Sequence, residues 1–318
     1  MKYSFIIPMY NEENDIKETI MRCLAQDTTN FDFEIILIND GSTDNTLKIC
    51  LDLFSTEKQI HIINEPVNKG VSHARNIGVS ASAGDIVIFL NADELIDANF
   101  LIKLHDHYNL KGADYVFPQT RVANTHTIYG LYRDCYRLTK YHRPNLFMWS
   151  QGFSCRRNLF ENVDGFSESY PGCGGEDWDF VSRLDGLHKN RVVDTSIVVK
   201  HTVPYGLKNV LWHIYNRGRG TAYYDLNYAK KSSVFHILRL LIHASIFCGF
   251  ILWDSNVALV VALLQFIRII IEGWKISKSS NNKKILIILM HISNCIIRTV
   301  GYNINMFKYV KNGKNESV

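Results

Sequence analysis

The sequence predicts an α/β fold, with a mostly parallel sheet in the first part of the chain and an apolar, helical C-terminal region. Short apolar segments alternate with helix-type patterns through the first 120 residues, which is typical of right-handed βαβ units. The segment 86–90 is continuously apolar and rich in β-branched and aromatic residues, as a strand buried on both faces requires. Residues 91–94, Asn-Ala-Asp-Glu, follow it directly. Because ligands of open α/β sheets bind at this end of the strands, we expect a ligand site there.

The individual strands and helices follow from the hydrophobic periodicity. Strands are expected at Tyr3–Ile7, Phe33–Ile38, Ile60–Ile63, Ile86–Leu90 and Tyr115–Phe117. Two helices between them each have apolar residues on one face: Ile16, Ile20, Cys23 and Leu24, then Leu47, Cys50, Leu51 and Phe54. The stretch 40–44, Asp-Gly-Ser-Thr-Asp, is expected to form a turn that starts the second helix, since these side chains accept hydrogen bonds from the first helical amides.

The middle of the chain, from residue 120 to about 205, is less regular and rich in aromatic residues, glycine and arginine. A loop-rich segment after a nucleotide-type sheet usually builds the site of a second substrate. Within it, residues 172–175 (Gly-Cys-Gly-Gly) are expected to form a mobile loop before Glu176. A helix is expected at 179–184 and a strand at 197–200.

The last hundred residues contain three strongly apolar runs, Val234–Trp253, Val257–Ile271 and Ile285–Val300. Only the first comfortably reaches the ~20 residues of a spanning helix. Polar residues recur on one helical face of each run: His236, Arg239 and His243, then Gln265, Arg268 and Glu272, then His291, Asn294 and Arg298. Short spanning helices, interfacial helices and a buried soluble subdomain all fit this pattern. The apolar density favours membrane attachment, and the number of spans stays open.

Charge and cysteine content limit the partners and the compartment. Lys and Arg number 35 against 31 Asp and Glu, so the overall charge gives no reason to expect a nucleic-acid partner. The seven cysteines form no C-x-x-C pair, and the first residues read as a strand rather than an export signal. Lysines beside the apolar runs also indicate the cytoplasmic side of a membrane. We therefore expect a location at the cytoplasmic face of the membrane.

Five local signals lie at or just after predicted strand ends. They are Pro8-Met9-Tyr10-Asn11-Glu12, then residues 39–45 around Asp40, then residues 68–76 with Lys69 and Arg75, then Asn91-Ala92-Asp93, and finally Gly175-Glu176-Asp177-Trp178-Asp179. The hard oxygen ligands of the fourth signal suit Mg²⁺ or Mn²⁺, which in turn suits a diphosphate. Alone, each signal is weak, and the first equally fits a capped helix start.

In order, spacing and residue type the five signals together resemble the family-two glycosyltransferases, which are inverting enzymes with the GT-A fold that use nucleotide sugars. The resemblance covers about residues 2–201 and implies site residues. The implied nucleotide-sugar contacts are Pro8, Tyr10, Glu12, Asp40, Lys69, Arg75, Asn91, Ala92 and Trp178. Asp93 matches the metal-binding position of the D-x-D motif, and Asp177, with Glu176, matches the catalytic base of the E-D motif.

Chemistry explains these residue types. A carboxylate base removes the proton of the acceptor hydroxyl as that oxygen attacks the anomeric carbon, so a single attack inverts the configuration. A divalent metal stabilises the charge of the departing diphosphate. One departure from the family pattern is Asn91, which stands where the motif usually has Asp and carries no charge. Asn39 likewise replaces a common Asp.

Two further features extend the resemblance. His201 matches a histidine that binds the metal or the diphosphate in some relatives, although a purely structural role fits equally well. Residues 217–220, Arg-Gly-Arg-Gly, resemble an element of membrane-bound exopolysaccharide glycosyltransferases. Arg217 and Arg219 on a flexible glycine backbone would suit a pyrophosphate of the nucleotide sugar, or would form a basic collar at the membrane.

These observations predict a metal-dependent, inverting glycosyltransferase of cell-surface polysaccharide synthesis. We expect it to move a sugar from a nucleotide donor, UDP-linked, to a glycan or lipid-linked acceptor. Residues 1–120 would bind the donor, 121–225 would bind the acceptor and complete the active site, and 226–318 would associate with the membrane. A Rossmann dehydrogenase would need G-x-G-x-x-G after its first strand, and a nucleotidylyltransferase a glycine-rich loop there; Tyr10-Asn11-Glu12-Glu13 is neither. Asn91 motivates the alternative of a non-catalytic glycan-assembly subunit.

Overall fold

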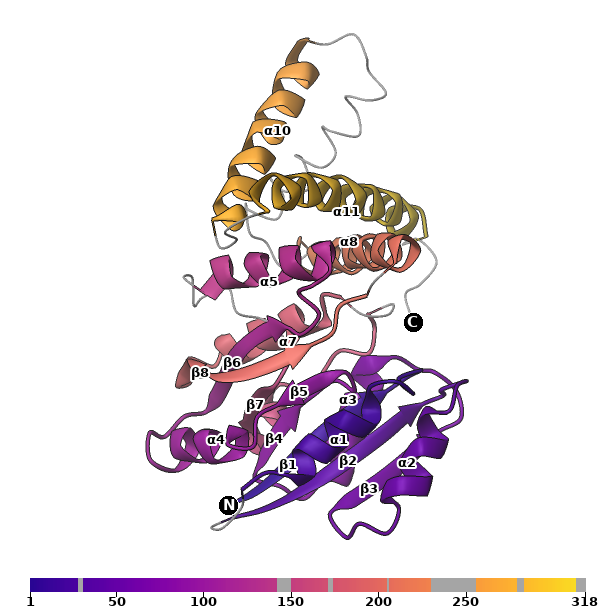
Figure 1. Cartoon of the computed structure of the whole chain (residues 1–318), viewed down its shortest axis with the longest axis vertical. Coiled ribbons are helices and arrows are strands. Elements are labelled where there is room, and N and C mark those ends of the chain that lie inside the picture. The colour runs from indigo at the N-terminus through magenta and orange to yellow at the C-terminus, as the bar shows by residue number, and fades with distance from the viewer. Residues whose placement is uncertain are drawn as a thin grey trace. The chain divides into compact units, whose positions relative to one another are not determined.

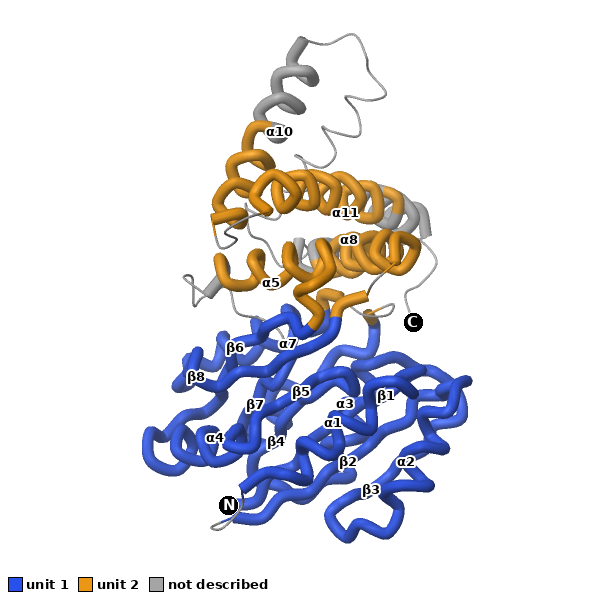
Figure 2. The backbone as a smooth tube through the Cα atoms, viewed as in Figure 1, with its two compact units in different colours: residues 1–123, 143–169, 176–202 blue, residues 124–142, 170–175, 203–318 orange. Residues whose placement is uncertain are grey.

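A computed structural model of the chain describes residues 1–27, 31–141, 150–170, 174–204, 206–229, 256–278 and 283–312. The chain forms two compact units (Figure 2). The first, here called the sheet unit, consists of residues 1–123, 143–169 and 176–202. The second, the helical unit, consists of residues 124–142, 170–175 and 203–318. Each unit is therefore built from segments that are distant in the sequence.

The sheet unit contains an eight-stranded sheet in its described residues, with the order β3-β2-β1-β4-β7-β6-β8-β5 (Figure 1). The strands are β1 (Lys2–Met9), β2 (Asp32–Asp40), β3 (Ile60–Glu65), β4 (Ile86–Phe89), β5 (Glu94–Ile96), β6 (Tyr115–Val122), β7 (Phe153–Arg156) and β8 (Arg191–His201). Strands β1 to β4 are joined by parallel pairs, whereas β7 pairs antiparallel with β4 and β6, and β5 pairs antiparallel with β8. The predicted α/β class and all five predicted strands are confirmed.

Among the described residues, six helices accompany this sheet. They are α1 (Ile16–Leu24), α2 (Thr46–Phe54), α3 (Val71–Ala81), α4 (Phe100–Asn109), α6 (Arg157–Asn162) and α7 (Glu176–Asp185). The predicted faces are confirmed in part: on α2, Cys50 and Phe54 are buried, but Leu51 is 46% exposed, so its place on the buried face was predicted wrongly. Helix α1 buries Ile16, Ile20 and Cys23, as predicted. Helix α3 lies unusually close to the sheet, since a Cβ at Gly78 would be 2.6 Å from the side chains of Ile6 and Ile38. This close approach brings the first turns of α3 to the carboxyl ends of the strands.

The order of the central strands defines where a ligand can bind. Strand β1 has β2 on one side and β4 on the other, both parallel to it. The chain connections therefore run in opposite directions from β1, and the loops after β1 and β4 separate at this switch point. Residues 10–13 follow β1 and residues 90–94 follow β4. The first and fourth sequence signals are thus neighbours at one edge of the sheet.

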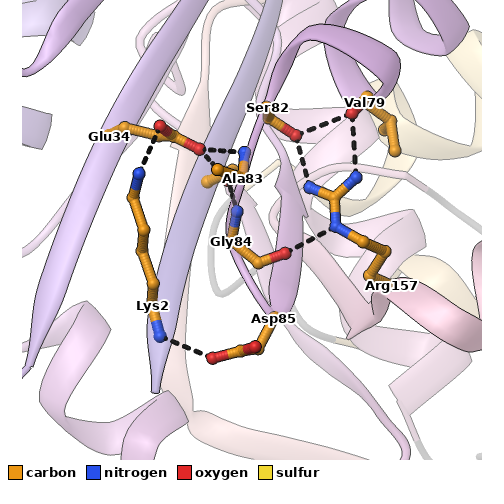
Figure 3. A network of polar contacts seen from close by, with 9 residues as sticks. Lys2, Glu34, Val79, Ser82, Ala83, Gly84, Asp85 and Arg157 are labelled. Atoms are coloured by element: carbon orange, nitrogen blue, oxygen red, sulfur yellow. Dashed lines mark hydrogen bonds and ion pairs between the residues drawn. The ribbon is translucent and has the colours of Figure 1, made fainter.

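The opposite edge of the sheet is closed by a polar network (Figure 3). The carboxylate of Glu34, which is 5% exposed, accepts hydrogen bonds from Lys2 Nζ at 2.7 Å, Ser4 Oγ at 2.7 Å and the Ala83 amide at 2.5 Å. Nearby, the Arg157 guanidinium donates to the carbonyls of residues 79 and 84 and to the hydroxyl of residue 82. The turn between α3 and β4 is therefore held from both sides, which sets where β4 begins.

The helical unit contains α5 (Ile128–Tyr141), α8 (Leu207–Ala229), α10 (Asn256–Ser277) and α11 (Lys284–Asn312) among its described residues. The apolar run 234–253, with His236, Arg239 and His243, lies outside the described residues. Residues 284–302 form a helical stretch long and apolar enough to cross a membrane, and only 28% of its apolar window is buried. A helix at the core of a soluble protein would be mostly buried. This exposure is compatible with the predicted membrane association.

Helices α8 and α11 approach each other through glycine. A Cβ at Gly218 would lie 2.9 Å from the Tyr302 amide, and a Cβ at Gly301 would lie 3.0 Å from the ring of Tyr215. Residues 217–220 form part of a continuous helix, so the expectation of a flexible glycine segment is wrong. Its glycines are required for helix packing instead, because any larger side chain would push the helices apart.

The polar network around Glu34 predicts a pH-dependent loss of stability. Burial by itself raises the pKa of Glu34, but the hydrogen bonds from Lys2, Ser4 and Ala83 lower it below its usual value. Glu34→Gln should therefore lower the free energy of unfolding by ~1–3 kcal/mol at neutral pH. Because the folded-state pKa is the lower one, the difference between variant and wild type should shrink as the pH falls through it. Urea unfolding with hydrogen exchange at the β1 and β2 amides measures this.

The matched control is Glu18→Gln, since the Glu18 side chain is 54% exposed and pairs only with Arg22 on its own helix. It should change the stability by less than ~0.5 kcal/mol. An equal effect of both substitutions would contradict the role given to the Glu34 network.

Candidate active site

The loops after β1 and β2 hold each other in place. Asn11, which has a left-handed backbone (φ 58°), accepts a hydrogen bond from the Thr43 amide at 2.8 Å through its side-chain oxygen. The Glu12 amide in turn donates to Thr46 Oγ1 at 2.7 Å, at the start of α2. These hydrogen bonds join the segment of the turn predicted at 40–44 to residues 8–12, the first of the five sequence signals. This leaves Tyr10 45% exposed at the rim, where its ring can stack on a planar ligand.

Glu12 lies among negative charges. Burial, followed by the negative charges of Asp93, Asp15 and Asp44, raises the pKa of Glu12 to about 8. At neutral pH its carboxyl group is therefore mostly protonated and able to donate a hydrogen bond. A cation bound nearby would have the opposite effect on this pKa, because it favours the ionised form.

Asp40 organises the start of α3. Its carboxylate is 3% exposed and accepts hydrogen bonds from the amides of Lys69 at 2.8 Å and Gly70 at 2.9 Å. Gly70 has φ +99°, a conformation suited to glycine, and α3 begins immediately after it. The Lys69 side chain pairs with Glu65 at 2.8 Å on the surface. The roles of Asp40 toward a base and of Lys69 toward a phosphate stay predictions.

Arg75 connects the separate parts of the site. It lies on α3, is 3% exposed, and donates to Asn91 Oδ1 at 3.2 Å and to Ser150 Oγ at 2.8 Å. It also donates to Asp177 Oδ1 at 3.1 Å, and it lies 3.6 Å from Glu176 Oε1. Its guanidinium therefore joins Asn91, in the loop after β4, to Asp177 in the first turn of α7. Asp177 is 102 positions from Arg75 in the chain. Sequence analysis did not predict the contacts of Arg75 with Asp177 and Glu176.

Asp177 is held by two donors. Helix α7 begins at Glu176, three residues before the expected start at 179, so Asp177 lies in its first turn, where the helix dipole favours a negative charge. Arg75 binds one carboxylate oxygen of Asp177, and the Ser150 amide donates to the other at 3.3 Å. Trp178 follows and is half-buried. Sequence reasoning missed Ser150, because its role depends on a contact 27 residues away.

Asn91 lies between a cation and a buried carboxylate. Its side-chain oxygen faces Arg75, which can only donate, so its nitrogen faces Glu94 and donates to Oε1 at 2.7 Å. Glu94 is fully buried. An aspartate at position 91 could accept from Arg75 but could not donate to Glu94. The departure from the family motif is therefore matched to Glu94, which the sequence placed in the expected ligand site without assigning it a role.

Asp93 and His201 are brought together by pairing of β5 with β8. Glu94 is opposite His201 in this antiparallel pair, and His201 Nδ1 lies 3.8 Å from Asp93 Oδ2. The His201 side chain is 9% exposed and that of Asp93 is 25% exposed. One carboxylate and one imidazole suit Mn²⁺, and Mg²⁺ is commonly bound by one or two carboxylates together with substrate phosphates. The residues present therefore fit a cation that takes its remaining ligands from a diphosphate and water.

Across the described part of the chain, no group of three or more His, Cys, Asp and Glu side chains is arranged to hold a metal alone.

Most predicted site residues lie in the sheet unit. They are Pro8, Tyr10, Glu12, Asp40, Lys69, Arg75, Asn91, Ala92, Asp93, Glu176, Asp177, Trp178 and His201. Pro8 is buried at the end of β1, and Ala92 is 2% exposed, with its carbonyl accepting from Thr19 Oγ1 at 2.7 Å. Arg217 and Arg219 lie on α8 in the helical unit.

Comparison with known proteins agrees with this geometry. Residues 4–167 match the model of glycosyl transferase family 2. An uncharacterised glycosyltransferase of Haemophilus influenzae is 35% identical over 119 residues, covering 36% of this chain and 47% of the relative. The chain thus aligns with less than half of that relative's length.

Two solved structures share the fold. Staphylococcus aureus TarS 1–349 in complex with UDP-GlcNAc has a TM-score of 0.53 and 19% identity, over 98% of this chain and 92% of that one. The mannosyltransferase PcManGT of Pyrobaculum calidifontis, in complex with GDP-Man and Mn²⁺, has a TM-score of 0.62 and 16% identity, over 94% and 86%. The sheet has the GT-A fold of these structures. The chain belongs to glycosyl transferase family 2.

The position of Asn91 leads to a specific expectation. Asn91→Asp would place a second carboxylate at hydrogen-bonding distance from buried Glu94, so two negative charges would repel or one would have to bind a proton. We expect the free energy of unfolding to fall by ~1–3 kcal/mol at pH 8, with a smaller loss at pH 5 where a shared proton is available. Chemical unfolding at both pH values measures this.

Asn99→Asp serves as the control because Asn99 is the exposed N-cap of α4, where the two residues are equally good. An Asn91→Asp variant as stable as wild type at pH 8 would refute the matching of Asn91 to Glu94.

Proposed function

We propose that the protein is a metal-dependent, inverting glycosyltransferase that transfers a sugar from a nucleotide donor, UDP-linked, to a glycan or lipid-linked acceptor. The observation that carries this is the contact of Arg75 with both Asn91 and Asp177. It brings the end of β4, where the donor diphosphate would lie, close to a carboxylate able to act as base. Membership of glycosyl transferase family 2 supports the same activity.

The donor would bind at the switch point between β1 and β4. Exposed Tyr10 would stack on the base, and Glu12 and buried Asp40 would form hydrogen bonds with the base and ribose. The fold shared with TarS, whose structure contains UDP-GlcNAc, supports a uridine nucleotide. Pro8, Lys69, Ala92 and Trp178 would complete the contacts with the nucleotide sugar.

Asp177 would act as the base. Its two donors, Arg75 and the Ser150 amide, would orient the carboxylate so that one lone pair receives the proton of the acceptor hydroxyl. The deprotonating oxygen attacks the anomeric carbon while the bond to the diphosphate breaks on the opposite face, so the configuration inverts. Glu176, 4% exposed and close to Arg75, would add a second negative charge that keeps the guanidinium in place.

Asp93 and His201 would hold Mn²⁺ or Mg²⁺. When bound, the cation supplies a positive charge that stabilises the leaving diphosphate. The structure of PcManGT with GDP-Man and Mn²⁺ shows that the shared fold accommodates a nucleotide sugar with this metal. Asn91 would remain on the Arg75 side and contribute no charge.

The acceptor would reach the enzyme from the membrane. The exposed apolar surface of α11 and the lysines that flank it support attachment at the cytoplasmic face, in cell-surface polysaccharide synthesis. In this scheme residues 1–120 bind the donor, 121–225 complete the active site with the acceptor, and 226–318 contact the membrane. The alternative of a non-catalytic subunit rested on Asn91, whose hydrogen bonds to Arg75 and Glu94 now account for it.

The base is tested by Asp177→Asn. This substitution keeps the size of the side chain but removes its basicity, so turnover of the accepted UDP-sugar should fall ~10²–10⁴-fold. Affinity for UDP with Mn²⁺, measured by calorimetry, should stay within a few-fold of wild type, because Asp177 contacts the acceptor and not the nucleotide.

The accepted donor is first found by screening a panel of nucleotide sugars for hydrolysis by the purified membrane fraction. Asp179→Asn, two residues further along α7 in an ion pair with Arg183, is the matched control and should retain turnover. Unchanged turnover of Asp177→Asn would refute the assignment of the base.

The metal role of Asp93 is tested separately. Mn²⁺ should strengthen UDP binding to the wild-type protein, and EDTA should reverse this. In Asp93→Asn the Mn²⁺-dependent part of the affinity should drop by ~10-fold or more, since even the loss of an outer partner of a metal ligand has this effect. UDP affinity that does not depend on Mn²⁺ in either protein would contradict the metal site.

A further inference from the structure

An aromatic ring covers one face of the Arg75 guanidinium. The ring is that of Phe166, whose centre lies 4.9 Å from Arg75 Cζ. Phe166 belongs to the segment between α6 and α7 and is 2% exposed. At this distance a guanidinium is attracted to the electron-rich face of the ring, more strongly where water is excluded. Arg75 therefore has a neighbour of a second kind, besides the oxygen atoms that accept its hydrogen bonds.

The hydrogen bonds of Arg75 leave one motion of its side chain weakly restrained. Nη1 donates to Asp177, and Nη2 donates to Asn91 and Ser150. Nε is buried and has no hydrogen-bond partner among the described residues. Bonds at Nη1 and Nη2 fix the outer end of the guanidinium, but the plane can still tilt about the line that joins these two atoms, since hydrogen bonds tolerate some misalignment. A ring packed against the face of the guanidinium opposes this tilt.

Asn76 fixes the backbone of Phe166 next to Arg75. Its side-chain nitrogen donates to the Phe166 carbonyl at 2.9 Å, and its side-chain oxygen accepts from the Phe166 amide at 2.9 Å. One side chain thus satisfies both backbone polar groups of Phe166. Gly165, whose φ is +62°, allows this approach, since a Cβ there would lie 2.7 Å from Asn76 Oδ1. Because Asn76 follows Arg75 directly on α3, the same helical turn holds the ring and the guanidinium.

A second contact fastens the segment of Phe166 to α3. Glu168 accepts from Asn76 Nδ2 at 2.8 Å through one oxygen, and its other oxygen lies 2.8 Å from His73 Nδ1. His73 and Asn76 are three residues apart and therefore lie on one face of α3. Burial by itself raises the pKa of Glu168, but the hydrogen bonds from Asn76 and His73 lower it below its usual value. Glu168 is therefore an ionised acceptor at neutral pH and holds residues 166–168 on α3.

The Phe166 ring also contacts the two elements that lead to the partners of Arg75. It stacks on Phe180 of α7, with ring centres 4.2 Å apart, and it meets Phe89 at the end of β4 edge-on, at 5.2 Å. Asp177 lies three residues before Phe180 on the same helix. The ring therefore lies against the guanidinium and against the helix that carries its carboxylate acceptor. A change in the ring would alter how Arg75 meets Asp177.

We propose that Phe166 is a positioning residue of the active site. Its ring fixes the tilt of the Arg75 guanidinium, and thereby the direction in which Asp177 presents its carboxylate. Asn76 acts on the same contact, because it fixes Phe166. The inference rests on the proposed function, in which Asp177 is the base. Since Phe166 is buried behind Arg75, it should govern the rate of transfer and not the binding of the donor.

The test compares Phe166→Leu with Phe160→Leu in the full chain. Both substitutions remove a buried ring from one aromatic cluster, because Phe160 also contacts Phe89 and Phe180, but the ring over Arg75 is that of Phe166. Phe166→Leu should lower kcat for the accepted UDP-sugar ~10-fold or more, because a small misplacement of a catalytic group has a large effect on rate. KM and the calorimetric affinity for UDP with Mn²⁺ should stay within a few-fold of wild type.

Phe160→Leu separates this role from a purely structural one. Its midpoint of urea unfolding should fall about as much as that of Phe166→Leu, while its kcat stays close to wild type. An equal loss of kcat in the two variants would overturn the proposal, and so would an unchanged kcat in Phe166→Leu.

Asn76→Asp is a second variant, and it leaves the aromatic cluster intact. The new carboxylate can accept from the Phe166 amide, but it cannot donate to the Phe166 carbonyl and it repels Glu168. We expect kcat to fall with KM retained. Adding Glu168→Gln supplies a donor for the carboxylate and should restore part of kcat. An Asn76→Asp protein with wild-type kcat, or a double variant without recovery, would overturn the role of Asn76.

A thermodynamic cycle tests the contact without turnover. Asp177→Asn should cost less stability in the Phe166→Leu protein than in wild type, because the guanidinium is then already less well placed against the carboxylate. In the Phe160→Leu protein its cost should match that in wild type. Additive effects with Phe166→Leu would overturn the proposal. Coupling in a protein that transfers no sugar from any donor of the panel would contradict the proposed function alone and support the positioning of Arg75 by Phe166.

Discussion

The buried guanidinium of Arg75 is the interaction on which the organisation of the candidate site depends. A cation that is 3% exposed and cannot lose its proton requires acceptors around it, and these come from the end of β4, from Ser150 and from the first turn of α7. Holding these three segments against α3 places Asp177 beside the residues that follow β4. The same contact also explains Asn91, since a neutral side chain that both accepts and donates can lie between Arg75 and Glu94. Stability and function are therefore linked through one side chain.

Charge is distributed unevenly within the sheet unit. The positive charge of Arg75 is matched by Asp177 and Glu176, whereas the negative charges near Glu12 and Asp93 suit an added cation. The sign of that negative charge matches the metal of the proposed reaction.

The sequence predicted the elements well where the signal was local. All five strands and the helices at 16–24 and 46–54 followed from periodicity over a few residues, and the helix predicted at 179–184 is present as α7, which begins three residues earlier. It did not reveal β5 and β7, because strands of three or four residues have too little periodicity to stand out. It also gave a wrong expectation for residues 217–220, since glycine signals flexibility locally, whereas here it permits close packing of α8 and α11.

By itself the sequence determined which residue types end the parallel strands, and therefore the family. Only the tertiary structure decided which of these residues act together. The pairing of Glu94 with His201 and the contact of Arg75 with Asp177 each join residues about 100 or more positions apart. Such contacts are set by sheet register and helix packing, which depend on the whole chain. Local periodicity carries no information about them.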